Sequence, residues 1–104
     1  VPELTLENVQ QLANAGKLGE AMEQGTKLLQ TNKSAELLHL LGVIADASGN
    51  ARGAQEYYRK ALFIDPKHRE SLEQVALHIE KSGDLRAARI WRDRVKRSEM
   101  EQPV

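Results

Sequence analysis

Apolar residues recur along the chain at the spacing of one face of an α-helix. The clearest stripe consists of Leu37, Leu38, Leu41, Ile44 and Ala45. Stripes of this kind predict six helices, over residues 3–15, 18–31, 35–48, 51–64, 69–82 and 85–98. Runs of β-branched residues are missing, so we expect an all-α fold.

Three glycines interrupt the helical pattern at a nearly fixed period. Gly16, Gly49 and Gly83 lie 33 and 34 residues apart. Each is followed five residues later by an alanine, namely Ala21, Ala54 or Ala88. Glycine adopts the left-handed conformation that closes a helix, and a small side chain one turn later lets two helices approach closely. A period near 34 residues is typical of stacked helical hairpins.

The predicted hairpins form one domain, residues 1–98. We expect three repeats, at approximately residues 2–34, 35–68 and 69–98. Residues 99–104 carry no pattern and are predicted to form a disordered tail. Because the chain begins at Val1 rather than at methionine, we expect it to be a fragment of a longer protein.

The composition excludes several classes of function. The 104 residues include 15 basic and 15 acidic side chains, so no net charge favours nucleic acid or an anionic membrane. Cysteine is absent, which rules out disulfides, cysteinyl zinc sites and a thiol nucleophile in this segment. No signal peptide and no long apolar run is visible, so we expect a cytoplasmic protein without membrane insertion.

The sequence contains no recognisable catalytic or metal-binding motif. His39, His68 and His78 do not have the spacing of paired metal ligands, and we interpret them as ordinary polar residues. Neither Ser71 nor Ser82 has a convergent base, and no glycine-rich phosphate loop is present. We therefore expect no catalytic residue, no metal and no cofactor in this segment.

The middle repeat resembles the tetratricopeptide repeat (TPR) family. The resemblance rests on Leu38, Leu41, Gly42, Ala45, Gly49, Ala54, Tyr58, Ala61, Leu62, Asp65 and Pro66. The flanking repeats depart from the family pattern, with Gly25 at an aromatic position and Trp91 one position early. The resemblance implies a right-handed superhelical stack of three helical hairpins that mediates protein–protein interaction.

A narrower resemblance concerns residues 41–50, residues 58–68 and the arginine-rich last helix. These segments are similar to the TPR segment of CheR-type (WspC-like) chemoreceptor glutamate methyltransferases of bacterial chemosensory and biofilm signalling. The resemblance implies a parent enzyme that uses S-adenosylmethionine, with this segment as its regulatory or targeting domain. A stand-alone TPR adaptor or a self-association module remains the alternative.

In a TPR stack, the first helix of each hairpin lines a concave groove. The expected groove residues are Glu36, His39, Leu40, Val43, Asp46, Glu70, Glu73, Gln74, Leu77 and Glu80. Others on these helices are Glu3, Leu6, Glu7, Gln10, Ala13, Asn14, Ala47 and Lys81. Acidic residues dominate, so the expected ligand is a basic and apolar protein segment, from a chemoreceptor or from the parent's own catalytic domain. The alternative is that these charged faces are only solvated.

The last predicted helix carries a basic patch, formed by Arg86, Arg89, Arg92, Arg94 and Arg97. Three interpretations are open: the soluble outer face of a terminal repeat, a docking site for an acidic partner or a second copy, and a nucleic-acid site. A basic helix without interleaved exposed aromatic residues is a weak nucleic-acid signal, so we expect no nucleic-acid partner.

Overall fold

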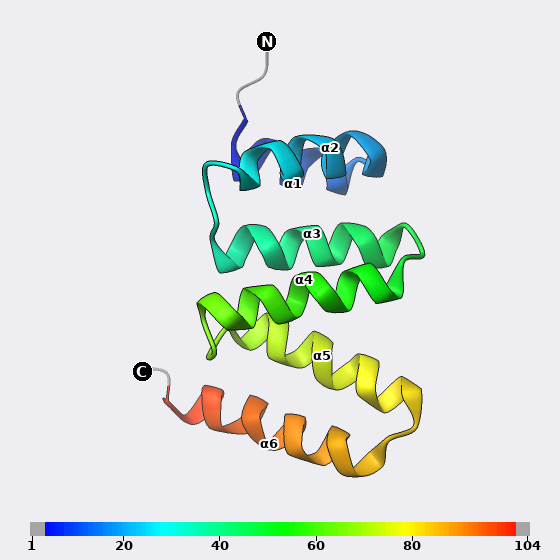
Figure 1. Cartoon of the computed structure of the whole chain (residues 1–104), viewed down its shortest axis with the longest axis vertical. Coiled ribbons are helices and arrows are strands. Elements are labelled where there is room, and N and C mark those ends of the chain that lie inside the picture. Colours follow the sequence, from blue (N-terminus) through cyan, green and yellow to red (C-terminus); the bar gives the residue numbers. More distant parts are fainter. Residues whose placement is uncertain (1–3, 102–104) are drawn as a thin grey trace.

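The computed structural model describes residues 4–101, which fold into six α-helices without a strand (Figure 1). The helices are α1 (Leu6–Asn14), α2 (Leu18–Leu29), α3 (Ala35–Ala47), α4 (Ala51–Ile64), α5 (Arg69–Ser82) and α6 (Leu85–Glu101). The predicted all-α class is therefore confirmed. No helix among the described residues is long and apolar enough to cross a membrane.

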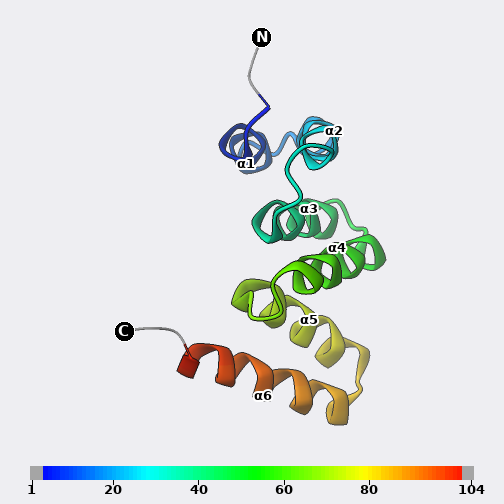
Figure 2. The same ribbon diagram turned by 60° about the vertical axis from the view of Figure 1, so that its left-hand side comes forward.

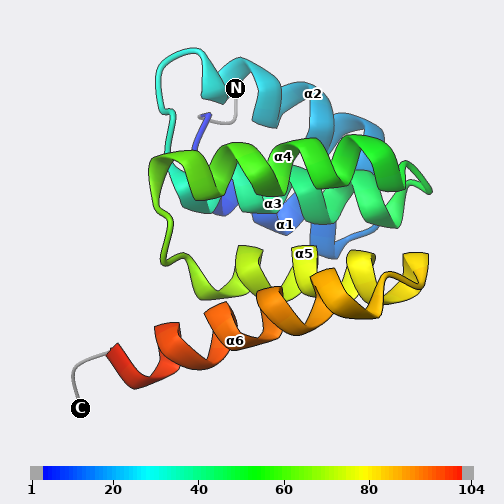
Figure 3. The same ribbon diagram turned by 60° about the horizontal axis from the view of Figure 1, so that its bottom comes forward.

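Consecutive helices run antiparallel and form three hairpins, α1–α2, α3–α4 and α5–α6, stacked along the long axis of the molecule (Figure 1). The stack is elongated, with principal dimensions of 47 × 32 × 21 Å. Figure 2 shows α1 and α3 on one side of the first two hairpins, with α2 and α4 on the other. Figure 3 shows α6 as the outermost helix beside α5, at the C-terminal end of the stack.

The three periodic glycines close the first helix of each hairpin. Gly16, Gly49 and Gly83 have φ values of 78°, 85° and 89°, in the left-handed region where a side chain would be strained. Asn50 and Asp84 then cap the second helices, since their side-chain oxygens accept hydrogen bonds from backbone N–H groups three residues later, at 2.9 and 3.0 Å. The chain therefore turns within each hairpin at the periodic glycine that the sequence shows.

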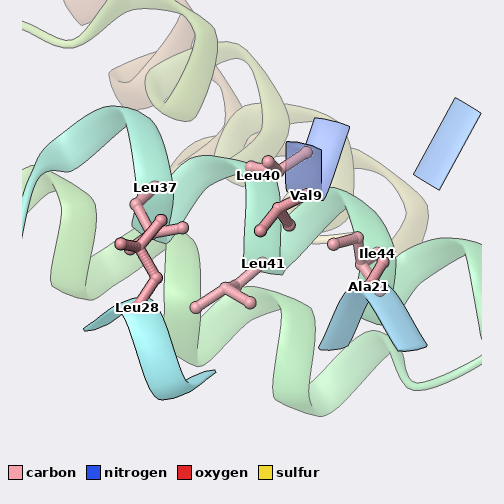
Figure 4. Close-up of a cluster of buried hydrophobic side chains, with 7 residues drawn as sticks. All are labelled: Val9, Ala21, Leu28, Leu37, Leu40, Leu41 and Ile44. Carbon is pink, nitrogen blue, oxygen red and sulfur yellow. The ribbon is translucent and has the colours of Figure 1, made fainter. Parts of the chain in front are cut away.

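The hydrophobic core lies in the contacts between helices rather than in one central mass. One cluster joins the first two hairpins and contains Val9, Ala21, Leu28, Leu37, Leu40, Leu41 and Ile44 (Figure 4). A second joins the last two hairpins and contains Ala45, Ala54, Tyr58, Leu62, Leu72, Val75 and Val95. Each large side chain buried in this way contributes about 1.5–3 kcal/mol. The α3–α4 hairpin supplies residues to both clusters and so holds the stack together.

Gly25 has a packing role that explains its departure from the repeat pattern. A Cβ atom at Gly25 would lie 2.6 Å from Cδ2 of Leu41, a residue with no exposed surface. The glycine therefore lets the Leu41 side chain of α3 pack directly against the backbone of α2. This contact offsets the roughly 1 kcal/mol that glycine costs relative to alanine inside a helix.

The two ends of the helical region differ from the prediction. α1 begins at Leu6 rather than at residue 3, because the Thr5 hydroxyl caps it by accepting a hydrogen bond from the Asn8 N–H. Glu3, a predicted groove residue, lies outside the described residues. The predicted tail begins at residue 99, but α6 continues to Glu101, and residues 102–104 of that tail lie outside the described residues. Ser98 is buried and donates a hydrogen bond to the Val95 carbonyl oxygen, so the buried face of α6 continues one turn beyond Val95.

The contact between Gly42 and Tyr58 gives a sharp test of the central hairpin. A Cβ atom at Gly42 would lie 2.4–2.9 Å from three atoms of the Tyr58 ring, which is only 1% exposed. We expect Gly42→Ala to lower the free energy of unfolding by about 1–3 kcal/mol, because the ring has no room to move. Urea denaturation followed by circular dichroism measures this.

The matched control is Gly19→Ala. A Cβ atom there meets nothing within 4 Å, and Gly19 lies inside helix α2. We expect this variant to be more stable by up to about 1 kcal/mol, because alanine loses less conformational freedom than glycine on helix formation. Equal effects of the two substitutions would contradict the proposed role of the Tyr58 contact.

Candidate partner-binding groove

Helices α1, α3 and α5 contribute to one open hollow of about 520 Å³. Its lining residues are Leu6, Gln10, Glu36, His39, Leu40, Val43, His68 and Glu70, and we call this surface the acidic groove. All but one of them were candidates from the sequence. His68 was interpreted as an ordinary polar residue outside the predicted helices, although it directly precedes the first residue of α5 and so lies close to Glu70.

The acidic groove combines two carboxylates with apolar surface. Glu36 and Glu70 are exposed, and no lysine or arginine lines the hollow. Val43 is 39% exposed and available to a ligand, whereas Leu40 is only 4% exposed and belongs to the core between the first two hairpins. A polar substitution at Leu40 would therefore disturb folding, so the carboxylates are the better positions for testing binding.

A buried serine links two histidines of the acidic groove. Oγ of Ser71 lies 2.8 Å from Nδ1 of His68 and 3.2 Å from Nδ1 of His39, and Ser71 has no exposed surface. A hydroxyl can donate to one imidazole and accept from the other. The second ring nitrogen of His68 is 3.6 Å from a carboxylate oxygen of Glu70. The sequence did not indicate that these histidines meet.

The pKa of His39 is lowered from its usual value. Burial is the main cause, the nearby His68 lowers it further, and the carboxylate of Glu70 partly opposes both. The neutral imidazole is thus the form that the folded groove favours at position 39.

Asp46, a predicted groove residue, is engaged in a contact that joins three helices. Its Oδ2 accepts a hydrogen bond of 2.8 Å from the Tyr58 hydroxyl of α4 and lies 3.0 Å from Nε2 of His78 on α5. Burial raises the pKa of Tyr58, and the hydrogen bond to Asp46 raises it further, so the hydroxyl stays a donor. Asp46 therefore fixes the second hairpin relative to the third.

The other predicted groove residues on α5 lie outside the hollow. Glu73 forms an ion pair of 3.6 Å with Arg69. The carboxylate of Glu80 accepts hydrogen bonds from the Arg92 guanidinium of α6. Gln74 is partly buried and Leu77 is 38% exposed. These residues continue the same helix face, but the structure does not bring them together with Glu36 and Glu70.

The basic patch on α6 is divided among several surroundings. The hydrogen bond to Glu80 raises the pKa of Arg92, and the two side chains form an ion pair within the chain. The Arg94 guanidinium lies over the Trp91 ring, 4.3 Å from its centroid. Arg94 and Arg97 also line a small hollow at the α4–α5 turn, while Arg86 and Arg89 are exposed. The five arginines therefore have different surroundings, and the charge of Arg92 is paired within the chain.

Among residues 4–101, no group of three or more histidine, aspartate or glutamate side chains is arranged to hold a metal ion. The histidines instead bond to serine and aspartate side chains that join helices.

Comparisons with known proteins agree with this architecture. Residues 35–68 match the tetratricopeptide repeat family. Over 94 residues, 89% of its length, the chain is 36% identical to a protein of Pseudomonas putida described as "Probable biofilm formation methyltransferase WspC". It is 34% identical over 92 residues to the protein of Pseudomonas aeruginosa with the same description. The chain spans only 22% of the length of either relative.

The lowered pKa of His39 predicts a pH-dependent stability. The unfolded chain binds this proton more tightly than the folded chain, so the free energy of unfolding should fall as the pH drops below about 6.5, the ordinary pKa. Above that pH the contribution is fully present. We expect His39→Gln to make the stability less dependent on pH between about pH 7.5 and about pH 5.5. Urea titrations at several pH values measure the slope, and identical slopes would contradict the prediction.

Proposed function

We propose that this tetratricopeptide-repeat segment is a protein-interaction module and that its acidic groove binds a basic and apolar segment of a partner protein. The observation that carries the proposal is the hollow formed by α1, α3 and α5, in which the exposed carboxylates of Glu36 and Glu70 flank apolar surface and no lysine or arginine is among the lining residues. A TPR segment is non-catalytic and mediates protein–protein contacts.

The two kinds of groove surface have different roles in the proposed interaction. Burying partner side chains against Leu6 and Val43 provides free energy at about 25 cal/mol per Å² of apolar area removed from water. Ion pairs to Glu36 and Glu70 contribute less, about 0.2–1 kcal/mol each when exposed, but they orient the ligand and speed its association. The hydrogen-bonded histidines below them keep the groove shape fixed before binding.

We infer further that the segment is the targeting or regulatory part of a CheR-type, WspC-like methyltransferase. The similarity extends over 89% of this chain but only 22% of each relative, which leaves ample length for a catalytic domain elsewhere in such a parent. That domain would use S-adenosylmethionine to methylate glutamates of a chemoreceptor. In this arrangement, the acidic groove holds the receptor, or the catalytic domain itself, by a basic segment.

The first experiment tests the groove with a peptide. The probe is a fluorescently labelled peptide in which arginines and lysines alternate with leucines, and anisotropy measures its affinity. We expect the double variant Glu36→Lys, Glu70→Lys to bind at least about tenfold more weakly, a loss of about 1.4 kcal/mol. Binding should also weaken as salt is raised, because the carboxylates are exposed.

The matched control is Glu56→Lys, combined with Glu20→Lys to give the same change in net charge. Both glutamates are exposed on second helices of their hairpins, and neither lines the groove. We expect this variant to retain most of the peptide affinity. Equal losses in the two double variants would show that net charge alone drives binding, which would contradict the proposed site.

A second experiment tests the proposed parent. The full-length protein is incubated with radiolabelled S-adenosylmethionine and with membranes that contain the chemoreceptors of the source cells. We expect methyl transfer to receptor glutamates, with Glu36→Lys, Glu70→Lys raising KM for the receptor and leaving kcat unchanged. A parent without methyl transfer would refute the enzymatic assignment but not the peptide-binding groove. A fall in kcat alone would refute the targeting role.

A further inference from the structure

The ends of α2 and α4 lie near the start of α3 at one edge of the stack (Figure 1). Residues from these helix ends line another hollow. It measures about 460 Å³ and is lined by Leu29, Lys33, Leu38, Lys60, Phe63 and Ile64. We call this surface the edge cleft. It shares no residue with the acidic groove.

The edge cleft exposes apolar side chains that folding does not use. Phe63 is 89% exposed and Ile64 is 46% exposed, while the preceding residues Ala61 and Leu62 are buried in the core. Leu38, only 4% exposed, and the half-buried Leu29 complete the apolar lining. A phenylalanine side chain can bury 150–250 Å² in an interface. An exposed phenylalanine therefore lacks the favourable free energy that burial of its ring would provide. Contiguous exposed apolar surface of this kind marks an interaction site.

The charge of the edge cleft is opposite to that of the acidic groove. Lys33 and Lys60 are its charged lining residues, and no carboxylate lines it. In the part of the chain that the structure describes, neither lysine is held in an ion pair, while the Lys60 ammonium lies 5.7 Å from the centroid of the Tyr57 ring. A basic ligand suited to Glu36 and Glu70 would meet repulsion here, so the two surfaces select different partners.

A symmetric contact with a second copy does not suit this surface. In a two-fold interface the same residues face each other, which would place Lys33 and Lys60 of one copy near those of the other. Like charges brought together in this way oppose association. The occupant should instead bring carboxylates to the lysines and apolar side chains to Phe63.

We propose that the edge cleft binds an acidic amphipathic segment of a partner protein. One or two apolar side chains of that segment pack on Phe63 and Ile64, over Leu38, and flanking carboxylates pair with Lys33 and Lys60. A contact of this size belongs to the weak and transient class of interfaces, below about 1,200 Å² of total buried surface. The chain would then join an acidic segment and a basic segment through two separate surfaces.

The test is an NMR titration of the isotope-labelled chain. The probe is an acetylated and amidated peptide in which glutamates flank two leucines and a phenylalanine at helical spacing. We expect resonance shifts confined to residues 29–38 and 57–64. We expect Phe63→Ser, and separately the double variant Lys33→Glu, Lys60→Glu, to raise Kd at least about tenfold, equivalent to 1.4 kcal/mol. Phe63→Ser should stay folded, because the ring is 89% exposed.

Two matched controls isolate the site. Ile90→Ser removes a side chain that is 56% exposed on α6, and Lys81→Glu with Lys96→Glu changes the net charge equally at exposed positions outside the edge cleft. Both controls should retain the peptide affinity, as should Glu36→Lys with Glu70→Lys. A peptide with lysines in place of the glutamates should not shift the edge-cleft resonances.

Several results would overturn the proposal. One is no peptide binding up to millimolar concentration, and another is a set of shifts centred on the arginines of α6. Equal losses in the controls and in the edge-cleft variants would also refute it. Sedimentation provides an independent check: a dimer of the wild-type chain that Phe63→Ser abolishes would show that a second copy occupies the cleft instead.

Discussion

The stack depends on the way in which Tyr58 is held between helices. The ring of Tyr58, on α4, lies so close to the backbone of Gly42 on α3 that no side chain fits at position 42. The Tyr58 hydroxyl donates a hydrogen bond to Asp46, which is also on α3. Asp46 in turn reaches His78 on α5. One aromatic residue thus sets the spacing of α3 and α4 and connects the second hairpin to the third. The positions of α3 and α5, and therefore of the groove walls, follow from this contact.

The helices and their turns were predictable because their causes are local. Apolar spacing set the six helices, and Gly16, Gly49 and Gly83 set the turns within hairpins through their left-handed backbone. The end of α6 lies three residues beyond the predicted residue 98, because residues 99–101 carry no apolar pattern. Within the predicted helix, Ser98 is a polar residue that continues the buried face by bonding to a carbonyl oxygen of its own helix. The apolar periodicity of a helix does not identify such a residue, because only apolar positions contribute to it.

The candidate groove could be outlined from the sequence, but its internal bonds could not. In a stack of hairpins, the first helices line the same face whatever their individual hydrogen bonds. Glu36, Val43 and Glu70 could therefore be predicted as groove residues. That His39 and His68 share the hydroxyl of Ser71 depends on the stacking of α3 against α5, which is a tertiary contact between residues about 30 positions apart. The edge cleft with its two lysines was not foreseen either, because its lining residues come from separate helices that only the stacking brings together.

The placement of the core between neighbouring hairpins has a consequence for the order in which the molecule opens. Each terminal hairpin contacts only the central hairpin, whereas α3–α4 contacts both terminal hairpins. Stability therefore depends mainly on contacts between successive hairpins, and unfolding begins at the two ends of the stack. Amide hydrogens of α3 and α4 should accordingly exchange slowest with solvent. Since the acidic groove takes one wall from α1, a ligand seated there would bridge from the fraying end to the protected centre, and occupancy would slow the opening of the first hairpin.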